Sequence, residues 1–171
     1  MTIWQACRAT SAASTFFDPI SIGIHEEQYL DGATGANNPV RELWTAAKDL
    51  WPEGHLEDKI KCLVSIGTGQ PSLEPFGESL VDVATTLLAI ATDTDRTAEA
   101  FAREHRDLAR EKRYFRFNVE KGLEKIGLEE FQKRSILVSA TRLYLESQAV
   151  YENLLACGEQ LSSKEGWFVY A

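Results

Sequence analysis

The apolar positions of the first half of the chain change between helical spacing and short continuous runs. Residues 3–9 are typical of the end of a helix, and Gln28–Leu30 is a short strand candidate. A helix is predicted over residues 38–51, because Asn38-Pro39 is a good helix start and apolar residues then recur every three or four positions. Ile60–Ile66 is the clearest strand, and its almost continuous apolar character indicates a buried strand of a parallel sheet.

The second half of the chain is richer in predicted helix. Residues 79–92 and 95–110 are predicted as two helices or one kinked helix, and Tyr114–Val119 alternates in the manner of a strand. A long helix is expected from about residue 129 to residue 157. Its apolar residues have heptad-like spacing, but two to three heptads are too few to establish an oligomerising coil, so a helix packed in the core is the preferred interpretation.

These elements indicate an α/β fold, because strand, helix and strand follow one another in the order of a layered α/β architecture. We expect two regions, residues 1–75 with the α/β pattern and residues 76–171 as a helix-rich C-terminal extension packed on it.

Composition and charge narrow the classes of function. The 171 residues carry 18 basic and 26 acidic side chains and a formal charge of −8, which argues against a nucleic-acid partner. The three histidines are isolated from one another and from the cysteines, so neither a metal site nor a cofactor is predicted. The odd, widely spaced Cys7, Cys62 and Cys157 are typical of buried free thiols in a reducing compartment.

The longest apolar stretch, residues 81–91, is interrupted by Asp82 and is far shorter than the roughly 20 residues that span a bilayer. The first residues also lack the basic start of a secretory signal. We therefore expect a cytoplasmic protein that can still work peripherally at a membrane surface.

The segment Tyr29-Leu30-Asp31-Gly32-Ala33 carries the candidate chemistry. A carboxylate at the end of a strand, followed by a glycine, lies on a turn where the backbone can bend sharply. Such a position projects a side chain into a cleft at the sheet edge, where an aspartate can take a proton from a neighbouring hydroxyl. Considered alone, the dipeptide Asp31-Gly32 favours a simple turn over a catalytic site.

Four blocks in order give this segment a context. They are residues 9–17 (Ala-Thr-Ser-Ala-Ala-Ser-Thr-Phe-Phe), Asp31-Gly32-Ala33, Asn37-Asn38-Pro39-Val40 and Ser65-Ile66-Gly67-Thr68-Gly69. Together they resemble the patatin-like phospholipase family, including its fungal members, closely over residues 1 to about 70 and more loosely through residues 114–118. The resemblance implies part of a three-layer α/β/α sheet and a hydrolase of lipid acyl esters that uses a Ser-Asp dyad.

The family's Asp-Gly-Ala motif falls on Asp31, Gly32 and Ala33, so the resemblance gives Asp31 the role of general base. It implies no cofactor, and it implies a lipid ester substrate, met at a membrane surface. The chain departs from the family pattern in one respect, because no serine is flanked by glycines as Gly-x-Ser-x-Gly. Ser65 is nearest in setting, but Leu63 precedes it by two residues.

Two hypotheses therefore stand. In the first, the chain is the base-bearing part of a lipid acyl hydrolase and is inactive alone, because the nucleophile-bearing N-terminal part of the same domain is missing. In the second, it is a catalytically dead patatin remnant that acts as an interaction or lipid-binding protein.

Gly67-Thr68-Gly69 is interpreted as a strand-ending turn rather than a phosphate cradle. Phe16, Phe17, Trp44 and Trp51 are candidates for an acyl pocket, although core packing is the better interpretation of the two tryptophans.

Overall fold

The computed structural model describes residues 1–13, 16–70, 81–124, 126, 130–162 and 167–170, with the backbone alone at 34, 81–92, 131 and 167–170. The elements in chain order are α1 (Ile3–Ala9), β1 (Ile20–Ile22), β2 (Glu27–Tyr29), α2 (Ala33–Ala36), α3 (Val40–Leu50), α4 (Leu56–Lys59), β3 (Ile60–Ile66), α5 (Val81–Glu104), α6 (Arg106–Arg110), β4 (Tyr114–Phe117), the 3-10 helix η1 (Phe131–Lys133), α7 (Arg134–Glu146), α8 (Gln148–Ser162) and β5 (Trp167–Tyr170).

The chain forms two compact units, residues 1–37 and residues 38–171. In the first, helix α1 begins with a capping box in which Thr2 and Gln5 satisfy each other's backbone amides. The helix covers the predicted residues 3–9. Strands β1 and β2 pair as an antiparallel hairpin, with Ile20 opposite Tyr29. The predicted strand at residues 28–30 is thus present but begins one residue earlier and ends at Tyr29.

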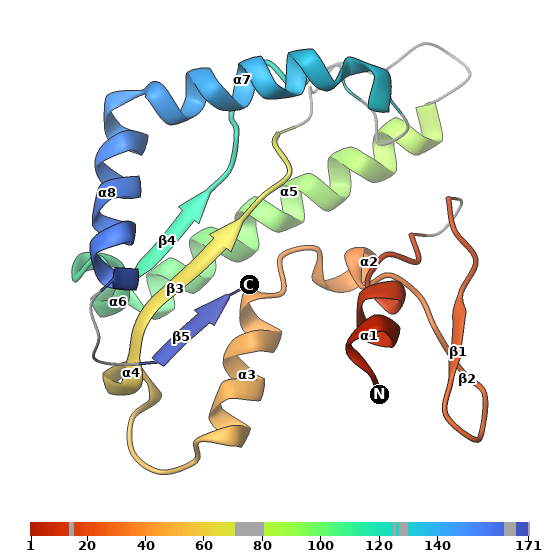
Figure 1. Cartoon of the computed structure of the whole chain (residues 1–171), viewed down its shortest axis with the longest axis horizontal. Coiled ribbons are helices and arrows are strands. Elements are labelled where there is room, and N and C mark those ends of the chain that lie inside the picture. The colour runs from red at the N-terminus through yellow and green to blue at the C-terminus, as the bar shows by residue number, and fades with distance from the viewer. Residues whose placement is uncertain (14–15, 71–80, 125, 127–129, 163–166, 171) are drawn as a thin grey trace. The chain divides into compact units, whose positions relative to one another are not determined.

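The second unit is built on a parallel sheet with strand order β4-β3-β5 (Figure 1). Strand β3 has the predicted bounds, Ile60–Ile66, and lies at the centre, where Val64 pairs with Phe115 on one side and with Tyr170 on the other. Its almost continuous burial confirms the prediction of a buried parallel strand. The mixed α/β class predicted from the sequence is confirmed as well.

Residues of β3 enter two different apolar clusters, and Leu63 lies in a different cluster from its neighbours Cys62 and Val64. Ile60 and Leu63 pack with residues of α3, α5 and α6, including Trp44, Phe101 and Leu108. Cys62 and Val64 pack instead with β4 and α8. Because side chains alternate across a strand, helices cover both faces of this sheet within residues 38–171. A third cluster joins the segment after β4 to α7.

Helix α3 ends at Leu50, two residues before Pro52, as the sequence predicted. The segment predicted as two helices or one kinked helix is continuous helix from Val81 to Glu104, and the break before α6 falls at His105 instead of residues 93–94. Residues 79 and 80 lie outside the described part.

The single long helix predicted over residues 129–157 is wrong. The chain turns at Ser147, whose ψ of 138° is extended, and the segment divides into α7 and α8. The prediction of a packed core helix holds only in part, because Ala140 and Cys157 are buried whereas Leu143 is 70% exposed.

The predicted regional boundary near residue 75 falls in 71–80, outside the described residues. Among the helices that the structure describes, none combines the length and the apolar character needed to cross a bilayer.

Candidate functional site

Asp31 lies two residues after the end of β2, at the start of the turn into α2. Its backbone amide donates to the carbonyl of Ala12 at 3.1 Å, and Ala12 is fully buried. Its side chain is half-buried, and Oδ1 accepts a hydrogen bond from the amide of Ala33 at 2.8 Å. The carboxylate is therefore held at one oxygen, and no second hydrogen-bond partner for it occurs among the residues that the structure describes.

The structure also shows what kind of strand precedes Asp31. Strand β2 belongs to the antiparallel hairpin of residues 1–37 and not to the parallel sheet of residues 38–171. The expectation of a cleft at the edge of an open parallel sheet therefore does not describe the local setting of Asp31.

Gly32 and Ala33 shape the turn at Asp31 through their backbone atoms. Gly32 has a φ of −69°, an ordinary helical value, and a methyl group at its Cα would meet no atom within 4 Å. The backbone at Gly32 therefore does not need the conformational freedom of glycine. Ala33 is the first residue of α2, and its amide is the donor to Asp31. The carboxylate accepts a hydrogen bond from the start of this short helical turn in the manner of an Asx turn.

Ser65, the serine nearest in setting to a nucleophile, is 1% exposed. Its hydroxyl accepts a hydrogen bond from Arg116 Nη1 at 3.0 Å and donates one to Asn38 Oδ1 at 3.3 Å. Both interactions fix the hydroxyl inside the protein, and neither partner is a general base. The structure therefore gives Ser65 a role in packing β3 and not in nucleophilic attack.

A group of polar side chains surrounds the carboxyl ends of β3 and β4. We call it the strand-end cluster, and its members are Asn38, Ser65, Gln70, Asp95, Arg116 and Asn118. Asp95 accepts hydrogen bonds from Gln70 at 2.9 Å and from Asn118 at 3.4 Å. Asn38 also donates to the carbonyl of Thr94, at 3.4 Å.

Sequence reasoning missed Arg116 and Asn118. Their signal is the alternation of β4, in which Phe115, Phe117 and Val119 share one side, so that Arg116 and Asn118 fall on the other.

Gly67-Thr68-Gly69 follows directly on the end of β3 and does not form an open cradle. The Gly67 amide donates to the carbonyl of Phe117 at 2.7 Å, and the Gly69 amide donates to Asn118 Oδ1 at 2.8 Å. These amides already have protein acceptors, which supports the prediction of a strand-ending turn. A methyl group on Gly67 would lie 2.3 Å from Asn118 Oδ1 and 2.6 Å from Arg116 Nη2, so both side chains would have to shift to admit it.

The remaining candidates are dispersed. Trp44 is 6% exposed in the first apolar cluster and Trp51 packs against it, which confirms core packing for both. Phe16 and Phe17 are exposed, at 40% and 61%. Cys62 and Cys157 are buried free thiols as predicted, whereas Cys7 is exposed. Within the described ranges, no three His, Cys, Asp or Glu side chains gather in a way that could hold a metal ion.

Comparison with known proteins places these residues in context. No protein-family model matches the chain, and no solved structure does. Phospholipase A I of Arabidopsis thaliana is 37% identical over 118 residues, which are 68% of this chain and 8% of that protein. Calcium-independent phospholipase A2-gamma is 34% identical over 97 residues in Oryctolagus cuniculus, 54% of this chain and 12% of the relative. The human protein of that name is 40% identical over 68 residues, 40% of this chain and 8% of the relative.

Part of this chain is homologous to patatin-like phospholipases. The resemblance inferred from the four sequence blocks is confirmed at this level, as a relationship to lipid acyl hydrolases. The chain spans only about 8–12% of the length of these relatives.

Proposed function

We propose that this chain is the base-bearing part of a patatin-like lipid acyl hydrolase and that Asp31 is the general base. The observation that carries the proposal is the Asp31-Gly32-Ala33 segment, in which the Ala33 amide holds one carboxylate oxygen. Homology to phospholipases supports the reaction class. The proposed substrate is a lipid ester at a membrane surface, and the proposed chemistry uses no metal, in keeping with the name of the calcium-independent relatives.

The proposed reaction has two steps. A serine supplied from outside these 171 residues attacks the ester carbonyl, and its proton passes to the Asp31 carboxylate. The tetrahedral intermediate then expels the alcohol, which takes that proton and leaves an acyl-serine. In the second step Asp31 accepts a proton from water, the water oxygen attacks the acyl-serine, and the proton returns to the departing serine. In each step the oxygen of Asp31 that does not accept from Ala33 handles the proton.

Hydrolysis of a phospholipid and of a short-chain nitrophenyl ester tests this proposal. The assay compares the 171-residue chain with a version extended by the coding sequence upstream of Met1. We expect activity only in the extended protein, and we expect Asp31→Asn to lower its rate about 10²–10⁴-fold, the usual contribution of a general base. Asp18→Asn is the matched control, because Asp18 is an exposed aspartate of the same compact unit. Retained hydrolysis in the Asp31→Asn variant would exclude Asp31 as the base.

A second candidate function is binding without catalysis. One observation favours it, namely that no serine of the chain is flanked as Gly-x-Ser-x-Gly. An in-frame Gly-x-Ser-x-Gly motif in the coding sequence upstream of Met1 would support the hydrolase, and a stop codon there would support the binding protein. If both proteins are inactive but sediment with phospholipid vesicles, the binding function replaces the hydrolase.

A further inference from the structure

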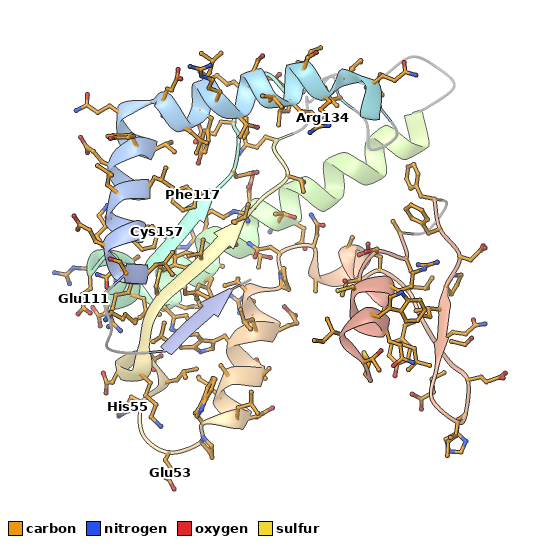
Figure 2. All side chains as sticks on the ribbon, in the orientation of Figure 1. Glu53, His55, Glu111, Phe117, Arg134 and Cys157 are labelled. Carbon is orange, nitrogen blue, oxygen red and sulfur yellow. The ribbon has the colours of Figure 1, made fainter. Side chains whose placement is uncertain are left out.

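Two of the three cysteines meet inside residues 38–171. Cys62 lies in the central strand β3 and Cys157 in α8, 95 positions apart, and their Sγ atoms are 4.0 Å from each other. Cys62 is fully buried and Cys157 is 4% exposed. In Figure 2, Cys157 lies on α8 beside the sheet.

The surroundings of the two thiols are apolar. Cys62 and Cys157 form one cluster with Val64 and Phe115, and Phe117 packs against it. A disulfide needs its sulfur atoms about 2.05 Å apart, so the two Sγ atoms must approach by about 2 Å. Because the two side chains already face each other across a packed interface, the bond requires a local adjustment of α8 against β3 and no rearrangement of the sheet.

We propose that Cys62 and Cys157 form a site of reversible oxidative modification, at which a hydroperoxide converts the two thiols into a disulfide that ties α8 to β3. This proposal is independent of the hydrolase function, because neither cysteine belongs to the Asp31 segment or to the strand-end cluster.

The chemistry takes place in two balanced steps. One thiol gives up its proton, and its sulfur attacks a hydroperoxide oxygen, forming a sulfenic acid and releasing an alcohol, or water when the oxidant is hydrogen peroxide. The second thiol then attacks the sulfenic sulfur. The S–O bond breaks, and the hydroxyl leaves as water with the second thiol's proton. Two thiols are oxidised and one peroxide bond is reduced.

Burial slows the reaction of both cysteines of the pair. It raises the pKa of Cys62 to about 12 and also raises the pKa of Cys157, although the hydrogen bond between the two thiols opposes this rise at Cys157. Both thiols are protonated at neutral pH and react slowly, and exposed Cys7 reacts before them.

Peroxide treatment of the full chain tests the proposal. A Cys7→Ser background removes the exposed thiol, which would otherwise link two chains. We expect hydrogen peroxide to produce one cross-linked peptide pair containing Cys62 and Cys157, lighter by two hydrogen atoms and separated again by dithiothreitol. The new bond closes a loop of about 95 residues, so we also expect the oxidised chain to melt roughly 10 °C higher than the reduced chain.

The double variant Cys7→Ser/Cys157→Ser is the matched control and should give neither the cross-link nor the rise in Tm. If this variant fails to fold, the Cys7→Ser chain still decides the question, because its thiol pair is intact. Separate sulfinic or sulfonic acids on Cys62 and Cys157 would overturn the proposal. A cross-link that forms only after denaturation would overturn it as well.

Discussion

Residues 1–37 and residues 38–171 differ most in what they bury. In the first unit, the buried apolar side chains among the described residues are those of Ala9, Ala12 and Ile22. In the second, large side chains such as Leu63, Phe101 and Leu108 are almost completely enclosed. Since burial of apolar area is the main source of stability, the larger unit supplies most of the folding free energy.

The proposed catalytic residue lies in the unit that has the smaller apolar core. Asp31 lies in the unit with little core, where its backbone amide donates to the carbonyl of Ala12 and its carboxylate accepts from the amide of Ala33. The strand-end cluster of the larger unit is instead a set of buried and half-buried polar groups whose hydrogen bonds connect β3 and β4 and the segments that follow them. Polar residues at the end of a parallel strand therefore support packing here, and the candidate for catalysis lies in the unit with the smaller core.

The largest effect on stability is expected from Phe101→Ala. Phe101 is 1% exposed and packs edge-on against Trp44, so its truncation should lower the free energy of unfolding by about 3–5 kcal/mol. Ile22→Ala is the comparison in the smaller unit and should leave the main urea-unfolding transition, followed by circular dichroism, almost unchanged. An equal shift of that transition by both variants would show that the two units unfold together and would break the comparison.

Much of the fold of residues 38–171 follows from local sequence patterns. Strand β3 was predictable because a short apolar run ends at Gly67, and the end of α3 was predictable because proline cannot continue a helix. The break between α7 and α8 was not, because Ser147 is neither glycine nor proline. Its hydroxyl donates to the carbonyl of Tyr144, a local bond that competes with helix and that heptad spacing does not reveal.

The turn at Asp31 could be predicted from the local sequence, whereas the strand-end cluster could not. The hydrogen bond between Asp31 and Ala33 spans two residues, and the turn at Asp31-Gly32 was accessible from the sequence. The contacts of Ser65 join residues 27 and 51 positions away, and only the register of β3 against β4 brings Arg116 opposite Ser65. No spacing along the chain encodes that register, so the strand-end cluster could not be predicted as a unit.

Two glycine substitutions, one in each unit, are expected to have effects of intermediate size on the free energy of unfolding. Gly67→Ala places a methyl group 2.3 Å from Asn118 Oδ1, so the neighbours must shift, and we expect a loss of about 1–3 kcal/mol in the free energy of unfolding. Gly32→Ala meets open space at a helical φ and should change stability by only a few tenths of a kcal/mol. Chemical denaturation of the two variants measures both values. Equal losses in the two variants would contradict the assignment of tight packing to Gly67 and open space to Gly32.

The smallest expected effect concerns the pH dependence of the larger unit. His105 is 13% exposed, packs against Trp44 and Phe101, and has its Nδ1 3.2 Å from Glu57 Oε1. Burial lowers the pKa of His105 below the usual 6.5 and outweighs the opposing effect of the Glu57 carboxylate. Lys48 also lowers this pKa, and Glu104 raises it. The unfolded chain therefore binds this proton more readily than the folded chain. The stabilising contribution of neutral His105 is complete above pH 6.5 and decreases as the pH falls below that value.

Titration of the His105 ring by NMR should accordingly give a midpoint below 6.5. Glu57→Gln should lower that midpoint further, because it removes the carboxylate that favours the charged ring. In urea unfolding, His105→Gln should lose stability less steeply than the parent chain between pH 7.5 and pH 5.5, whatever its absolute stability. A midpoint above 6.5 in the parent chain would mean that the ion pair with Glu57 dominates over burial, and stability would then change with pH in the opposite direction.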